Sequence, residues 1–125
     1  MNKMKNEQQY KKTRIRTRMF SYLKQAKKEY NEYKKHKDTL KLAEGGEKLW
    51  RAFNYYMELR MNKSLKTSRE VRQAVYLQHD TNIISIYDNA SWLHQFFYGW
   101  TDNIEDVIYN FNIVYNGLMY YSKNV

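Results

Sequence analysis

Apolar side chains recur every three or four residues along almost the whole chain, and this spacing constrains the fold more than any other feature of the sequence. No proline interrupts the pattern, and only four glycines occur in 125 residues. Long helices suit such a composition, whereas a β architecture needs many more turn-forming residues. The sequence therefore predicts an all-α protein, folded as an antiparallel bundle of four to five helices.

The first two predicted helices are the longest. The apolar stripe of the first covers about residues 15–36. A second stripe covers residues 42–57 and keeps its phase across Gly45 and Gly46. We therefore expect one continuous helix there, although each glycine costs about 1 kcal/mol relative to alanine. Gly46 falls on the stripe itself, which predicts a close approach to neighbouring backbone at that point.

Polar residues mark where the later helices begin and end. Thr67 followed by Glu70 has capping-box spacing and predicts the start of a short third helix. A fourth helix is expected to end near Gly99, because glycine readily adopts the left-handed conformation that terminates helices. Asp102 and Glu105 would form an acidic first turn of the fifth helix, where the helix dipole stabilises negative charge.

The stripes also predict the core and leave a surplus of rings. We expect close packing among the apolar residues at the centres of the stripes, namely Leu49, Trp50, Phe53, Leu93, Phe97, Val107, Phe111, Val114 and Leu118. The chain has 13 tyrosines, five phenylalanines and three tryptophans, which is more aromatic surface than one bundle interior can hold. Because Tyr and Trp are enriched at protein interfaces, the surplus predicts a homodimer or a higher homo-oligomer.

A length of 125 residues predicts a single bundle domain over residues 15–125, preceded by a polar and basic arm over residues 1–14. A helical extension, a neighbouring subunit or a bound polyanion could order that arm.

No apolar run approaches the roughly 20 residues that span a bilayer, and the basic N-terminus lacks the apolar block of a secretory signal. We therefore expect a soluble cytoplasmic protein without a membrane span.

Positive charge is concentrated in the first part of the chain. Residues 1–72 hold 21 Lys or Arg against eight Asp or Glu, whereas residues 73–125 hold one lysine against five acidic residues. Such a basic segment predicts an anionic partner, nucleic acid above all and less often an anionic membrane surface. Phosphate contacts carry affinity without base identity. We expect them from the cationic residues of the first helix, Arg14, Arg16, Arg18, Lys24, Lys27, Lys28, Lys34 and Lys35.

The side chains present exclude several kinds of chemistry. There is no cysteine, so thiolate metal sites and Cys–His nucleophile pairs are ruled out. The three histidines, His36, His79 and His94, are too few and too scattered to form a metal cluster. Gly45 and Gly46 lack the spacing and the preceding strand of a phosphate-binding loop. The sequence thus predicts neither a metal nor a cofactor.

Two aromatic-rich motifs occur on the second and fourth predicted helices. The first is Glu47-Lys48-Leu49-Trp50-Arg51-Ala52, and the second is Leu93-His94-Gln95-Phe96-Phe97-Tyr98. Together they resemble the archaeal PaREP1-like branch of the HEPN superfamily of small helical bundles. The resemblance covers about residues 40–121 and leaves the basic first helix outside. It implies a HEPN-like bundle and a function on RNA, since HEPN proteins are often RNA-cleaving or RNA-binding.

Many HEPN ribonucleases resemble one another in an arginine followed, after four to six residues, by a histidine. The resemblance implies that the arginine holds the phosphate and that the histidine, paired with it across a dimer, assists attack by the ribose 2′-hydroxyl. Arg72 and His79 have this spacing, but they fall on the short third helix rather than on the late helix that usually carries the motif. His94 fits the histidine position, yet residues 87–89 are Tyr, Asp and Asn where the arginine is expected.

The missing arginine is typical of a degenerate member, because an aspartate beside a scissile phosphate would repel it. His94 is then interpreted as a half-buried residue that is hydrogen-bonded between helices. We therefore favour a non-catalytic HEPN-like module that binds nucleic acid, RNA more readily than DNA, in a defence, toxin–antitoxin or mobile-element setting.

Two alternative functions stay open. One is a metal-independent ribonuclease toxin, for which Arg72, His79 and His94 are the candidate catalytic residues. The other is a scaffolding subunit whose basic helix docks an acidic partner protein. Because HEPN domains also pair with nucleotidyltransferases, the resemblance adds a nucleotidyltransferase-type chain to the expected partners.

Overall fold

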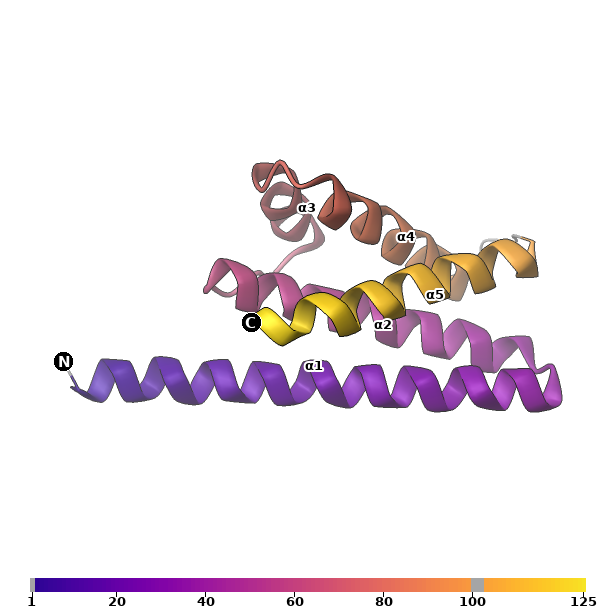
Figure 1. The fold of residues 1–125 in the computed structure, drawn as a ribbon, viewed down its shortest axis with the longest axis horizontal. Coiled ribbons are helices and arrows are strands. Elements are labelled where there is room, and N and C mark those ends of the chain that lie inside the picture. The colour runs from indigo at the N-terminus through magenta and orange to yellow at the C-terminus, as the bar shows by residue number, and fades with distance from the viewer. Residues whose placement is uncertain (1, 100–102) are drawn as a thin grey trace.

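Five α-helices and a short 3-10 turn make up the computed structural model, which describes the backbone of residues 2–99 and 103–125 and the side chains of residues 11–99 and 103–125 (Figure 1). The elements are α1 (Asn2–His36), α2 (Thr39–Met61), α3 (Ser68–Leu77), α4 (Thr81–Phe97), α5 (Ile104–Tyr121) and η1 (Ser122–Asn124). Within these ranges there is no strand, which confirms the predicted all-α class. None of the described helices combines the length and the apolar character that crossing a bilayer requires.

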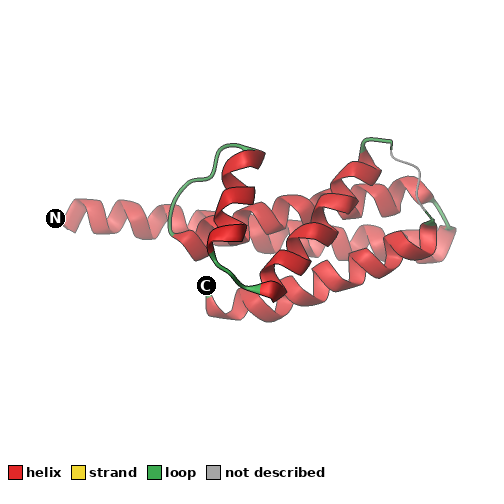
Figure 2. Ribbon diagram, turned by 90° about the horizontal axis from the view of Figure 1, so that it is seen from above, coloured by secondary structure: helices red, strands yellow, loops and turns green. Residues whose placement is uncertain are grey.

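The helices form two antiparallel pairs, and α2 of the first pair contacts both helices of the second. α1 and α2 make a long hairpin, and α4 with α5 packs on the other side of α2 (Figure 1). The short α3 links the two pairs. The N-terminal part of α1 runs past the end of the bundle (Figure 2). Of the alternatives for the basic arm, residues 2–14 therefore adopt the helical extension, and the first helix begins well before residue 15.

The helix ends follow the predicted capping chemistry. The Thr67 hydroxyl accepts a hydrogen bond from the Glu70 N–H at 3.1 Å, and the Glu70 carboxylate accepts one from the N–H of the residue before the cap. Gly99 follows the last turn of α4 with a left-handed φ of 100°, as expected of a helix terminator. The fifth helix is capped by Asn103, whose side chain accepts a bond from a first-turn N–H. Asp102 lies outside the described residues.

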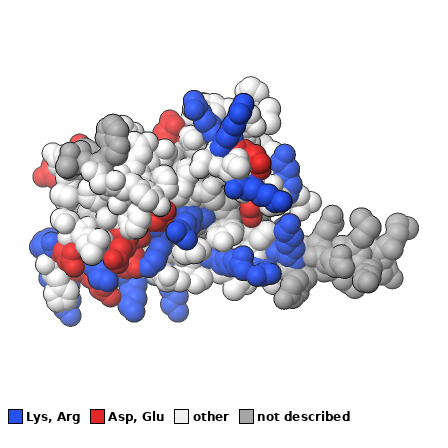
Figure 3. All heavy atoms as spheres, turned by 180° about the vertical axis from the view of Figure 1, so that it is seen from behind, with Lys and Arg blue, Asp and Glu red and all other residues white. Residues whose placement is uncertain are grey.

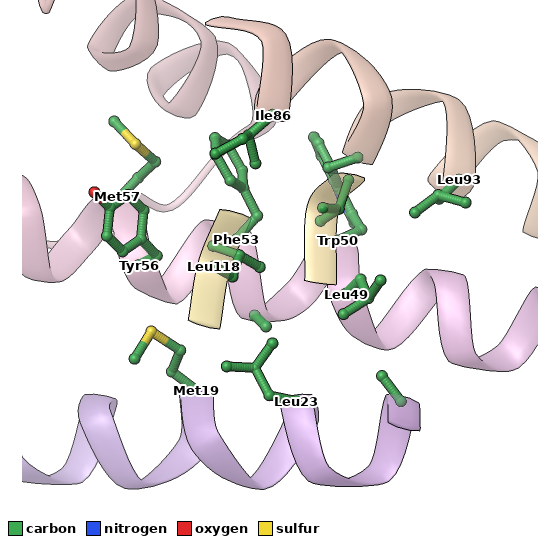
Figure 4. Close-up of a cluster of buried hydrophobic side chains, with 14 of the residues drawn as sticks. Met19, Leu23, Leu49, Trp50, Phe53, Tyr56, Met57, Ile86, Leu93 and Leu118 are labelled. Carbon is green, nitrogen blue, oxygen red and sulfur yellow. The ribbon is translucent and has the colours of Figure 1, made fainter. Parts of the chain in front are cut away.

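The apolar stripes meet in one core between α1, α2, α4 and α5 (Figure 4). Met19 and Leu23 of α1 lie opposite Leu49 and Phe53 of α2, and all four are almost completely buried. Every predicted core residue is buried except Phe97, whose side chain is 36% exposed. Phe97 was placed in the core by its spacing, but it occupies the last turn of α4, where the stripe reaches the edge of the bundle.

Two adjacent glycines allow α2 to pack closely on its neighbours without breaking. The helix is continuous through Gly45 and Gly46, as the phase of the stripe predicted. A Cβ on Gly45 would lie 3.2 Å from the backbone oxygen of Ala26 and 3.2 Å from the ring of Phe111. A Cβ on Gly46 would instead lie 3.2 Å from the Leu93 side chain. The close backbone approach is therefore made at Gly45, and the prediction that assigned it to Gly46 was wrong by one residue.

Candidate functional site

The two motifs of the sequence face each other across α2 and α4. The Nδ1 atom of His94 lies 2.8 Å from Oε2 of Glu47. The Trp50 ring stacks on the imidazole with 4.9 Å between ring centroids, and the Tyr98 ring meets it edge-on at 4.9 Å. Residues of the two motifs, 44 to 51 positions apart in the sequence, are thus assembled into one small aromatic and ionisable cluster, which we call the Glu47–His94 cluster.

Glu47 holds this cluster together. Its side chain is only 7% exposed, and a carboxylate so deeply buried needs partners that compensate for lost water. Because an ionised carboxylate only accepts hydrogen bonds, the Nδ1–H of His94 is the donor. This bond orients the ring, whose side chain is 32% exposed. His94 is therefore half-buried and bonded between helices, as the sequence interpretation expected.

Arg51 extends the cluster toward solvent. Its Nε lies 3.7 Å from Oε1 of Glu47, so the one carboxylate faces both His94 and Arg51. A hydrogen bond to the Tyr22 hydroxyl, helped by the Glu47 charge, raises the pKa of Arg51 above its already high value. A hollow of about 370 Å³ opens beside these groups and is lined by Tyr22, Glu47, Trp50, Arg51, Asn54, Tyr55, Glu58 and Leu65.

The segment that would carry the motif arginine is occupied by other interactions. Tyr87 packs its ring against Trp50 and Phe53, and burial among these groups raises the pKa of its hydroxyl. Asp88 is exposed, and the Asn89 side chain donates a hydrogen bond to a backbone oxygen one turn earlier. α4 contains no arginine. The guanidinium that lies next to the Glu47–His94 cluster belongs to Arg51 on α2.

Arg72 and His79, the other candidate pair, are not brought together. Arg72 is exposed on α3, and its guanidinium lies 5.9 Å from the Tyr76 ring centroid. His79 is exposed in the turn after α3 and has a left-handed φ of 50°. Within the described ranges no hydrogen bond or ion pair links the two side chains, and no three His, Asp or Glu side chains gather as a metal site would require.

The predicted cationic face of α1 is open to solvent. Exposed positions are Arg14, Arg18, Lys24, Lys28, Lys34 and Lys35, whereas Arg16 and Lys27 are partly buried. Figure 3 shows basic side chains spread along the edge of the molecule that α1 forms, with acidic side chains gathered toward the α1–α2 turn. None of the eight cations has a carboxylate within ion-pair distance among the residues whose side chains are described.

A groove of about 630 Å³ lies between this face and α5. We call it the α1–α5 groove, and its lining residues are Phe20, Leu23, Lys24, Lys27, Lys28, Asn31, Glu32, Lys35, Tyr115 and Met119. Apolar side chains supply its floor and lysines its rim. The Lys27 ammonium lies 5.1 Å from the Tyr115 ring centroid, a cation–π contact that ties rim to floor.

Sequence reasoning missed two parts of this arrangement. The motif comparison predicted no role for Glu47, although an acid next to the buried positions Gly46 and Leu49 signals that a partner must reach it. The groove was missed because Tyr115 and Met119 come from a helix that periodicity alone does not place beside α1.

Compared with known proteins, the chain matches no family model, no curated protein and no solved structure.

Proposed function

We propose that this chain is a non-catalytic, HEPN-like helical module that binds nucleic acid, RNA in preference to DNA, through the cationic face of α1. The observation that carries the proposal is the set of eight cations on α1 that lack an acidic partner among the described side chains. Like charges on one helix repel each other, so an unpaired row of them favours a bound polyanion. At 1.5 Å per residue the row from Arg14 to Lys35 extends for about 30 Å, long enough for several phosphates.

Binding of this kind depends on salt and little on sequence. If about five of the cations contact phosphates, log K falls with log salt at a slope of about −4.5 for duplex and about −3.5 for a single strand. Replacing Lys24, Lys27 and Lys28 with glutamine should weaken binding to all sequences alike and flatten the slope. Fluorescence anisotropy with labelled oligonucleotides over a series of salt concentrations measures both effects.

A matched control removes the same charge elsewhere. Lys66, Arg69 and Arg72 are exposed at the end of the α2–α3 loop and on α3, and none of them lines the α1–α5 groove. Their triple glutamine variant should keep most of the affinity. Strong binding that ignores salt and survives the α1 substitutions would contradict the proposal, and the scaffolding function with an acidic protein partner would replace it.

The Glu47–His94 cluster supports a second candidate, a metal-independent endoribonuclease. Here Glu47 would hold the imidazole, His94 would take the proton from a ribose 2′-hydroxyl, and Arg51 would stabilise the phosphate. The shared carboxylate at 2.8 Å from His94 and 3.7 Å from Arg51 is the observation that favours it. Cleavage of RNA by the purified chain, lost in His94→Ala and in Arg51→Ala but kept in His79→Ala, would establish it over the non-catalytic proposal.

A homo-oligomer belongs to the same proposal. Several large apolar side chains remain exposed on α4 and α5, namely Trp92, Phe97, Tyr98, Tyr109, Met119 and Tyr120. Large exposed apolar patches mark interaction sites, and Tyr and Trp are enriched at protein interfaces. A second copy would cover part of this surface and place a second cationic α1 on the same polyanion.

A further inference from the structure

The floor of the α1–α5 groove exposes apolar side chains that a protein would normally bury. Phe20 and Met119 are each 39% exposed, although both lie in a hollow beside the fully packed Leu23. Behind them, stacked rings lead back to the core, with Tyr30 against Phe111 at 4.6 Å and Phe111 against Tyr115 at 6.3 Å. The floor is therefore an aromatic and apolar surface that is backed by packed rings and remains open to a ligand.

The rim of the groove adds charge of one sign. Lys24, Lys28 and Lys35 come from the exposed face of α1, and spacings of four and seven residues place them about one and two helical turns apart. The single acidic side chain in the lining, Glu32, faces Lys41 at 3.7 Å. A ligand that fits both parts must present an apolar, flat group inward and negative charge outward.

We infer that the α1–α5 groove selects unpaired nucleotides, with a base stacked on Phe20 and the neighbouring phosphates on the lysine rim. This inference rests on the proposed function and adds the strand state of the ligand to it. An unpaired strand can turn a base out to stack on an aromatic side chain. A duplex keeps its bases inside and offers only phosphates, so it would contact the rim and leave the floor empty.

The test compares three ligands of equal length: a single-stranded oligoadenylate, an abasic ribose-phosphate oligomer and a duplex. Phe20→Ala should weaken the binding of oligoadenylate by about five- to tenfold, the lower range for one stacked base, and should leave the other two ligands unchanged. Phe20→Trp, which keeps a stacking surface, should retain the affinity. Tyr76→Ala removes an exposed ring of α3 that is not in the groove lining and serves as the matched control.

The possible outcomes distinguish a failure of this inference from a failure of the proposed nucleic-acid binding. If Phe20→Ala leaves all three ligands unchanged while the lysine substitutions weaken them, the nucleic-acid function stands and the inference is overturned. Equal weakening of all three ligands by Phe20→Ala also overturns it, because the ring would then act through the shape of the groove. If none of the three binds and an acidic amphipathic peptide does, both proposals fail and the groove is a protein-docking site. Circular dichroism melting confirms that each variant is folded.

Discussion

The cations of α1 and those of α2 are used in opposite ways. Every Lys or Arg of α2 faces a carboxylate, in the pairs Lys41–Glu32, Lys41–Glu44, Lys48–Glu29, Arg51–Glu47 and Arg60–Asp80. The eight predicted binding residues on α1 have no such partner among the described side chains. Charges paired in this way hold helices in place, whereas an unpaired row raises the electrostatic energy of the free protein and lowers it when an anion binds. The comparison separates structural charge from charge available for binding.

The largest expected effect concerns the core that carries both helices. Phe111 is fully buried and stacks on Tyr30 of α1, so Phe111→Ala should reduce the free energy of unfolding by about 3–5 kcal/mol. Chemical denaturation measures the loss. A reduction below about 1 kcal/mol would mean that the site relaxes around the missing ring, contrary to close packing of the rings behind the groove.

Paired and unpaired lysines should respond differently to the same substitution. Lys48→Gln leaves the carboxylate of Glu29, whose side chain is 11% exposed, without its cation, and should reduce the free energy of unfolding by about 1–3 kcal/mol. Lys28→Gln removes an exposed charge and should change it by less than about 0.5 kcal/mol. Urea titrations measure both values.

The same two variants should reverse their order in a binding assay. Oligonucleotide affinity should fall for Lys28→Gln and stay unchanged for Lys48→Gln once both proteins are folded. If Lys48→Gln weakened binding as much as Lys28→Gln, the division between structural and binding charge would be wrong.

The sequence predicted those parts of the fold that depend on local spacing. The stripe of α2 continued through Gly45, and Thr67 capped α3 where its hydroxyl could reach the Glu70 N–H. Such features need only a few neighbouring residues, so periodicity and cap chemistry suffice. Phe97 shows the limit of this reasoning, because its phase is correct for the core while its position at the end of α4 leaves it exposed.

The candidate sites depend on contacts between distant segments, which local patterns do not encode. The order of the two motifs indicated that they belong together, but the rotation of α2 against α4 decides that Glu47, rather than another polar residue, reaches His94. The cationic row on α1 was visible in the sequence. The aromatic floor of the α1–α5 groove was not visible there, because Tyr115 reaches the groove only through the packing of α5.

Self-association would extend the unpaired charge of α1 over two chains. Trp92 on α4 is 46% exposed and lies on a helix whose only acidic residue is Asp88. If this face forms the interface, Trp92→Ser should weaken dimerisation by about tenfold, since a central tryptophan contributes more than 1 kcal/mol. Light scattering at several protein concentrations measures the change. A monomer mass for the unsubstituted chain at concentrations in the micromolar range would rule the dimer out.

The smallest expected effect is a change in the titration of Tyr56, which reports on Arg60, one of the paired cations of α2. The Tyr56 hydroxyl accepts a hydrogen bond from Arg60 Nη1 at 3.1 Å, and Arg60 also faces Asp80. Burial raises the pKa of Tyr56 above its ordinary value of about 10, although Arg60 acts in the opposite direction. The folded protein therefore disfavours the phenolate more than the unfolded chain does. The contribution of Tyr56 to the free energy of unfolding is therefore fully present below a pH of about 10. It is lost as the pH rises through the pKa of Tyr56 in the folded protein.

An ultraviolet titration of tyrosinate formation should show this directly. Tyr56→Phe should remove part of the late phase, because burial raises the pKa of the Tyr56 hydroxyl. Arg60→Gln should move the late phase to still higher pH, because the group that favours the phenolate is lost. If the late phase moved to lower pH instead, Arg60 would not be held against Tyr56, and the pairing that distinguishes α2 from α1 would fail at this residue.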